Sequence, residues 1–182
     1  ELLSEPPLIQ GTLSEDVTGF EEYTVVYQLD IPDEAQYNNG PIPYSIDSSS
    51  SIDFSFDRVA YYLELEKTNQ PRTWVFVSFP SITTKPDELG IPTFSSGIVH
   101  NQLLTDVEIQ SNHQNLSSLG TIDTGVIEFW GTNYGMQDSL GVPNGNDSIY
   151  DMADSQYSTD SAGYGSMQIH DYESGQTLFA YN

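Results

Sequence analysis

The feature that most constrains this chain is a series of short apolar runs with period two, separated by Gly, Pro and Asn. In residues 56–66 one parity is apolar and the other is mostly polar, and residues 73–79 are apolar almost throughout. Period two is the side-chain repeat of a β-strand, and Asn69-Gln70-Pro71 is a typical turn sequence between two such runs. The two runs therefore predict a β-hairpin. Further strands are expected at residues 23–31, 103–109 and 126–130 and in two short segments joined by residues 173–175.

The pattern predicts an all-β fold of seven or eight strands, a β-sandwich or jelly roll with antiparallel strands and long loops. No amphipathic helix and no internal repeat is evident, although Lys85–Leu89 is expected to form one helical turn begun by Pro86. The length of 182 residues suits one domain. Residues 1–20 mix Pro, Ser and acids and predict a linker or N-terminal extension, followed by a single domain over 21–182.

The charge balance limits the possible partners. Four Lys and Arg oppose 27 Asp and Glu, giving a formal net charge of −23. Nucleic-acid binding requires basic side chains that neutralise phosphates, so this class is excluded. The chain has no apolar stretch of the roughly 18 residues needed to cross a membrane, and no membrane insertion is expected. We expect neutral, cationic or metal-bridged partners, and the absence of Cys excludes disulfides and thiolate metal sites.

A long polar segment, residues 131–163, contains the best candidate for a metal site. Calcium prefers six to eight oxygen ligands, and four side chains that offer them lie within eleven residues: Asn144, Asp147, Asp151 and Asp154. The spacing is not that of an EF-hand. We therefore expect structural calcium in this loop. The alternative is that these side chains cap turns of the loop backbone.

An aromatic motif at the end of the strand over 126–130 is the first candidate for ligand binding. Trp130 and Tyr134 offer ring faces that stack on a sugar, and Asn133 offers an amide for its hydroxyl groups. The alternative is that Trp130 belongs to the hydrophobic core.

A polar stripe near the C-terminus is the second candidate. Gln168 and His170 share one parity of a predicted strand, and Tyr164 precedes them on the same parity. Such a stripe is expected to form the floor of a carbohydrate-binding groove, or alternatively a solvated sheet face.

Catalytic signatures are weak. The chain has no G-x-S-x-G nucleophile motif, and His100, His113 and His170 are far apart in sequence. With 27 acids, no pair of carboxylates is diagnostic of glycoside hydrolysis. No catalytic residue is assigned.

Four segments carry a resemblance to a known domain: FDRVAYYLEL, IEFWGTNYG, VPNGNDSIYD and GYGSMQIHDYESGQTLFAYN. They resemble an accessory domain of large secreted proteins from marine and planctomycete-type bacteria, often labelled sialate O-acetylesterases or agarase-like hydrolases. The resemblance spans roughly residues 23–182. It implies a β-sandwich module, separate from the esterase, in a secreted or cell-surface multidomain protein that degrades polysaccharide. The Gly-Asp-Ser-type nucleophile motif of the esterase itself does not occur here.

The Gln168-Ile169-His170 strand is also similar to the Q-[IV]-H strand of alginate-lyase jelly rolls. Those enzymes additionally need an Arg-rich strand and a Tyr/Lys strand. The basic residues here, Arg58, Lys67, Arg72 and Lys85, do not form such a set.

The sequence thus predicts a non-catalytic carbohydrate-binding module for a polysaccharide, algal and neutral in charge, such as a galactan or glucan. Two alternatives remain. One is a glycan-active lyase or hydrolase that uses Gln168, His170 and a Tyr. The other is a calcium-stiffened adhesion or structural domain of a cell surface.

Overall fold

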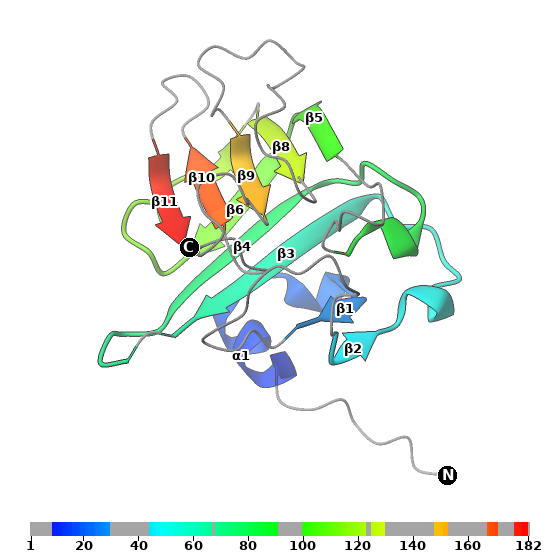
Figure 1. Cartoon of the computed structure of the whole chain (residues 1–182), viewed down its shortest axis with the longest axis horizontal. Coiled ribbons are helices and arrows are strands. Elements are labelled where there is room, and N and C mark those ends of the chain that lie inside the picture. The colour runs from blue at the N-terminus through cyan, green and yellow to red at the C-terminus, as the bar shows by residue number, and fades with distance from the viewer. Residues whose placement is uncertain are drawn as a thin grey trace, which may run out of the picture.

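The computed structural model describes residues 9–29, 44–66, 68–90, 100–122, 125–129, 148–152, 167–170 and 177–181. These residues form mostly β-strands, with one α-helix and three short 3-10 helices (Figure 1). The prediction of a β-rich fold with little helix is confirmed. All but one of the strand pairings are antiparallel, and the strands belong to sheets of four, five and two strands.

The four-stranded sheet has the order β3-β4-β6-β7 and is antiparallel throughout. Its strands are β3 (Arg58–Leu65), β4 (Thr73–Pro80), β6 (Val107–Ser111) and β7 (Gly120–Ile122). Strands β3 and β4 pair over their whole length, from Arg58 opposite Pro80 to Leu65 opposite Thr73. The predicted hairpin is therefore confirmed, and its turn contains Asn69 at a positive φ of 61°.

Strand β4 lies at the centre of the core because it is buried on both faces. Val75, Val77 and Phe79 are completely buried on one face, where Tyr61 of β3 stacks on Phe79 with ring centroids 5.9 Å apart. Trp74 and Phe76 are buried on the other face. Apolar residues on both parities of the run 73–79 thus reflect two covering layers.

The N-terminal segment covers the face of the sheet that carries Trp74 and Phe76. Helix α1 (Ile9–Asp16) and the 3-10 helix η1 (Phe20–Glu22) flank Val17, which is 3% exposed and contacts these two aromatic residues (Figure 1). Leu13, Phe20 and Tyr23 also contact this cluster. Residues 1–20 were expected to be a linker or extension, but in the described part of this segment Leu13, Val17 and Phe20 pack against the core.

The predicted strand over residues 23–31 is much shorter in the structure. Among the described residues 23–29, only β1 (Tyr27–Gln28) pairs, with β2 (Ile46–Asp47), in a small antiparallel sheet. Tyr23 instead follows η1 and packs edge-to-face on Phe76, while Val25 is 37% exposed. The period-two pattern was misleading here because its aromatic residues contact two different parts of the core.

The five-stranded sheet has the order β11-β10-β9-β8-β5. Its strands are β5 (His100–Leu104), β8 (Gly125–Phe129), β9 (Ser148–Met152), β10 (Met167–His170) and β11 (Thr177–Tyr181). Strands β8, β10 and β11 confirm predicted strands. The expectation of antiparallel strands is wrong for β8 and β9, which pair in parallel.

One local expectation is wrong and another is confirmed. The strand predicted over 103–109 is two strands in different sheets, since β5 ends at Leu104, β6 begins at Val107, and Asp106 between them has a φ of 60°. The helical turn expected near Pro86 is the 3-10 helix η3 (Pro86–Glu88), and a further 3-10 helix, η2 (Ser49–Ser51), precedes β3.

Candidate functional site

A row of polar residues crosses the five-stranded sheet. Asn101 of β5 lies opposite Glu128 of β8, Glu128 lies opposite Asp151 of β9, and Asp151 lies opposite Gln168 of β10. Residues directly opposite one another on neighbouring strands lie on the same face of a sheet. The register of four consecutive strands therefore aligns four residues of polar or acidic type at positions of one face, and we call these four residues the polar row.

The neighbouring row has the opposite character. His100, Phe129, Met152, Met167 and Tyr181 lie opposite one another across all five strands. Successive residues of a strand occupy opposite faces, so this mainly apolar row belongs to the other face from the polar row. The two rows therefore differ in character, although the next pair on the face of the polar row, Leu103 opposite Val126, is apolar.

Gln168 and His170, predicted from the sequence to share a groove floor, both lie in β10. Gln168 opposes Ala180 of β11, and His170 opposes Thr177. The β10–β11 register shifts between Ile169 and His170, so one extra residue of β11 stands between these two pairs. A bulge of this kind increases the local twist of a strand and redirects the residues beyond it.

The predicted calcium segment is only partly within the described residues. Asp151 lies in strand β9 rather than in a loop, so it is a member of the polar row. Asn144, Asp147 and Asp154 lie outside the described residues, as do Trp130, Asn133, Tyr134 and Tyr164 of the predicted carbohydrate site. Within the described part of the chain, no group of three or more His, Asp or Glu is arranged to hold a metal ion.

The sequence analysis missed Asn101 and the role of Glu128. Glu128 belongs to the motif that ends in Trp130, but its alignment with Asp151 depends on the parallel pairing of β8 and β9. Asn101 follows His100 in a segment where the predicted strand began too late. No local pattern identifies either residue, since both join the row only through strand pairing.

Two arginines belong to the four-stranded sheet and are already engaged. Arg58 donates from Nη1 to Oδ2 of Asp106 over 2.7 Å, and from Nε to the Oγ of buried Ser78 over 3.0 Å. The Tyr23 hydroxyl lies 2.5 Å from the same Oγ. Hydrogen bonding to its partners raises the pKa of Arg58 despite partial desolvation, so the guanidinium is a fixed structural cation.

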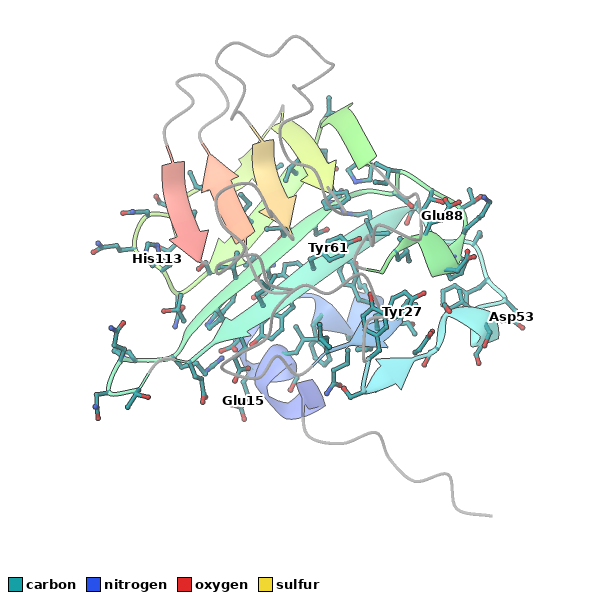
Figure 2. The ribbon with its side chains drawn as sticks, viewed as in Figure 1. Glu15, Tyr27, Asp53, Tyr61, Glu88 and His113 are labelled. Carbon is teal, nitrogen blue, oxygen red and sulfur yellow. The ribbon has the colours of Figure 1, made fainter. Side chains whose placement is uncertain are left out.

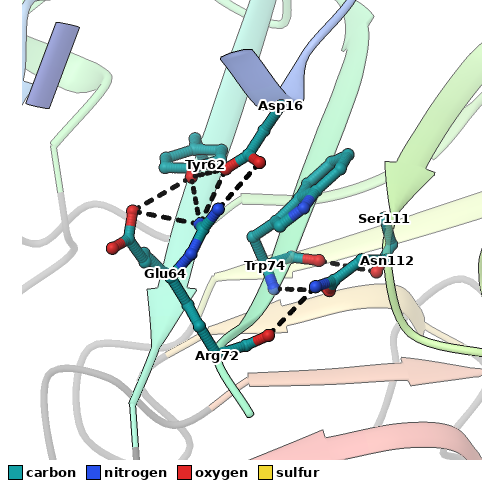
Figure 3. A network of polar contacts seen from close by, with 7 residues as sticks. All are labelled: Asp16, Tyr62, Glu64, Arg72, Trp74, Ser111 and Asn112. Atoms are coloured by element: carbon teal, nitrogen blue, oxygen red, sulfur yellow. Dashed lines mark hydrogen bonds and ion pairs between the residues drawn. The ribbon is translucent and has the colours of Figure 1, made fainter. Parts of the chain in front are cut away.

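Arg72 forms a second polar network, shown in Figure 3. Its two terminal nitrogens donate to both carboxylate oxygens of Asp16, over 2.7 and 2.8 Å, and Glu64 lies 3.4 Å from Nη1. The Tyr62 hydroxyl donates to Asp16 over 2.7 Å. The hydrogen bonds from Arg72 lower the pKa of Asp16, and burial together with the bond to Asp16 raises the pKa of Tyr62.

The positions of the charged side chains separate the two sheets chemically. Arg58 of β3 pairs with Asp106 of the β5–β6 connection, Arg72 before β4 pairs with Asp16 of α1, and Lys85 pairs with Glu88 over 2.6 Å. The described strands of the five-stranded sheet contain no Lys or Arg, whereas Glu128 and Asp151 are acidic. The residue types of the polar row are therefore those of hydrogen-bond acceptors and amides rather than those of an anion-binding site.

No family model, curated protein or solved structure matches this chain. In the residues that the structure describes, none of the helices has the length and apolar character required to cross a membrane.

Proposed function

We propose that this chain is a non-catalytic carbohydrate-binding module. Its polysaccharide ligand lies across the five-stranded sheet, on the face that carries the polar row. The polar row is the observation that carries the proposal. Carboxylates and amides accept and donate hydrogen bonds to hydroxyl groups in fixed directions, as the polar groups of sugar sites do.

The dimensions of the row support an extended ligand. Neighbouring strands are about 4.8 Å apart, so the three intervals from Asn101 to Gln168 span roughly 14 Å. A short oligosaccharide segment lying across the strands would meet all four residues. His170, on the strand of Gln168, would extend the contact surface along β10.

The charges favour a neutral glycan. A uronate or sulfated chain placed on Glu128 and Asp151 would bring like charges together, and a like-charge contact costs binding free energy. The structure supplies no compensating cation from Arg58 or Arg72, since they already pair with Asp106 and Asp16. A neutral galactan or glucan meets no such penalty. An uncharged ligand also fits the net charge of −23.

The wider setting is part of the same proposal. The resemblance implies a β-sandwich arrangement of the two larger sheets, secretion by a bacterium and attachment to a polysaccharide-degrading enzyme. The acidic 144–154 segment implies a structural calcium ion. The strand content of the described residues is consistent with the sandwich, and the remaining features await direct tests.

Affinity electrophoresis through gels that contain agarose, laminarin or xylan tests the binding proposal. We expect the wild-type chain to be retarded by at least one neutral polysaccharide, and Glu128→Gln and Gln168→Ala to be retarded at least fivefold less. Glu66→Gln is the matched control, because Glu66 is an exposed carboxylate at the end of β3 in the other sheet. Equal retardation of all four proteins, or of none of them, would refute the proposal.

Two further measurements separate the alternatives. Incubation of each polysaccharide with the protein should release no reducing ends and no unsaturated product, and turnover abolished by His170→Ala would establish a glycan-active enzyme instead. Melting with calcium and with a chelator tests the metal, since an ion bound only to the folded state raises the melting temperature in proportion to ln(1 + [Ca²⁺]/Kd). A large calcium shift without glycan binding would favour an adhesion domain.

A further inference from the structure

A second surface feature lies at the open end of the β3–β4 hairpin, away from the turn that joins these strands. The residues before β3 and after β4 border an open depression of about 590 Å³, lined by Phe56, Asp57, Ser81, Ile82, Thr83 and Thr84. This volume is in the range of small-molecule sites. A backbone hydrogen bond from the Ser81 N–H to the Asp57 carbonyl, 2.7 Å long, continues the hairpin ladder and joins the two sides of the depression.

One wall of the depression is held rigid by its own hydrogen bonds. The Ser81 hydroxyl donates to the Thr83 carbonyl over 2.5 Å, and the Thr83 hydroxyl donates to Glu88 over 2.5 Å and accepts from the Lys85 N–H over 3.1 Å. Lys85 in turn forms an ion pair with Glu88 of η3 (Figure 2). Because these groups satisfy one another, the loop after β4 has a defined shape before any ligand arrives, which lowers the entropic cost of binding.

Two polar groups remain available in this wall and floor. Within the described part of the chain, neither the Asp57 carboxylate nor the Thr84 hydroxyl has a hydrogen-bond or ionic partner, and both side chains belong to exposed residues. Phe56 is half-buried in the lining, and Phe54, two residues earlier, is 52% exposed. Phe54 does not line the depression itself, but its exposed ring offers further apolar surface two residues away along the chain.

We propose that this depression is a second carbohydrate subsite, which takes a single neutral pyranose unit. The Phe56 ring supplies an apolar face for the C–H face of the sugar, the Asp57 carboxylate accepts from two neighbouring hydroxyl groups, and the Thr84 hydroxyl binds a third. Phe54 contacts the adjoining unit of a longer chain. The inference extends the proposed function to the four-stranded sheet, and the residues that carry it are separate from the polar row.

The charges around the depression restrict the ligand. Asp57 is acidic, and the basic residues near it in the chain or loop, Arg58 and Lys85, are paired with Asp106 and Glu88, respectively. An anionic sugar therefore has no counter-charge here, whereas neutral hydroxyl groups are good donors to a free carboxylate.

Saturation-transfer difference NMR with methyl β-galactopyranoside and methyl β-glucopyranoside is the direct test. We expect transfer to at least one of the two glycosides, with a millimolar Kd. The Asp57→Asn variant should weaken the Kd about tenfold, because it removes charge-assisted hydrogen bonds. Phe56→Leu should remove the transfer to the C–H face, and Thr84→Val should weaken binding about threefold to fivefold. Asp53→Asn is the matched control, since Asp53 is an exposed carboxylate of the same segment but does not line the depression (Figure 2).

The variants distinguish this inference from the proposed function. Loss of glycoside transfer in Asp57→Asn, with transfer preserved in Glu128→Gln, supports a separate subsite. Transfer that is lost in Glu128→Gln and preserved in Asp57→Asn assigns the ligand to the polar row and overturns the inference, but leaves the proposed function intact. No transfer to either glycoside in the wild-type protein also overturns it, whatever the polysaccharide gels show.

Discussion

The ion pair between Arg72 and Asp16 offers the sharpest test of the N-terminal architecture. It joins the end of α1 to the residue before β4, so it fastens the N-terminal segment over the sheet face that carries Trp74 and Phe76. The Asp16 side chain is only 10% exposed and accepts from both terminal nitrogens of Arg72. We predict that Asp16→Asn destabilises the whole domain rather than releasing a loose tail.

The expected cost is about 2 kcal/mol. Asn offers only one acceptor oxygen to Arg72, because its Nδ2 can only donate, so one of the two bonds becomes neutral and the other is lost. Hydrogen bonds to a charged group contribute about 1.5–3 kcal/mol and neutral ones about 0.5–1.5 kcal/mol, so the change costs roughly 2.5–4.5 kcal/mol before solvent screening. Screening reduces this to about 2 kcal/mol, because Arg72 is 30% exposed and keeps Glu64 at 3.4 Å as a second partner. For a domain of this size, about 2 kcal/mol lowers the melting temperature by about 4–8 °C.

The pH dependence of this cost has a definite sign. Arg72 lowers the pKa of Asp16 below its ordinary value of 3.8, so the pair contributes its full stability above that value. The contribution is lost as the pH falls through the lower pKa of the folded state. The difference in the free energy of unfolding between wild type and Asp16→Asn should therefore be constant from pH 7 to about pH 5 and shrink below pH 3.8.

Urea unfolding followed by Trp fluorescence, at pH 7, 5 and 3, measures this difference. The double variant Asp16→Asn with Arg72→Gln should show a coupling of about 1.5–2 kcal/mol, and Glu66→Gln serves as a control for the loss of an exposed carboxylate. A difference at pH 7 below 0.5 kcal/mol, or one that stays the same at pH 3, would refute the argument that this pair fastens the N-terminal segment.

Three further predictions concern a side-chain hydrogen bond, a glycine contact and the net charge. Asn112→Ala should lower the free energy of unfolding, measured in urea, by about 1–2 kcal/mol. The reason is that the Asn112 side-chain amide accepts from the Trp74 backbone N–H and donates to the Arg72 carbonyl (Figure 3). Asn112→Asp keeps the acceptor alone, so its stability should lie between those of wild type and Asn112→Ala. Gly90→Ala should lower the free energy of unfolding by about 1 kcal/mol, since its new Cβ would lie 2.7 Å from the Tyr44 hydroxyl oxygen. This loss should be smaller in a Tyr44→Phe background. An equal loss in both backgrounds would contradict the steric explanation. Raising NaCl from about 10 mM to 1 M should raise the melting temperature measured by calorimetry, because salt screens the repulsion within a chain of net charge −23, and a fall would show that the ion pairs outweigh this repulsion.

The parts of the fold that follow from neighbouring residues were predictable from the sequence. The β3–β4 hairpin was predicted from an alternating run, an almost wholly apolar run and the turn between them. The β10–β11 pair was predicted from two short runs on either side of residues 173–175. Each pairing is decided by turn chemistry and by alternation within about twenty residues. The 3-10 turn at Pro86 was predictable for the same reason, since proline fixes its own φ at the first helical position.

The polar row was not predictable, because it depends on pairing between distant segments. Asp151 follows Glu128 by more than twenty residues, and the two meet only because β8 and β9 pair in parallel with a register shift after Val126. A change of one residue in that register would place Asp151 on the other face of the sheet. Sequence reasoning identified Gln168 and Asp151 as functional candidates separately, but assigned them to a sugar site and a calcium loop. The structure places them opposite each other.

The N-terminal segment shows that a signal was present in the sequence but was assigned to the wrong cause. The run 73–79 is apolar on both parities, so its strand requires an apolar layer on each face. One face is accounted for by residues such as Phe79, Val107 and Leu116. The other needs a second cover, and the composition of residues 1–20, with its prolines and acids, concealed it. Val17 and the helix before it supply that cover. A doubly apolar strand in a small β-rich chain is thus evidence for a second layer, even where the segment that forms it has the composition of a linker.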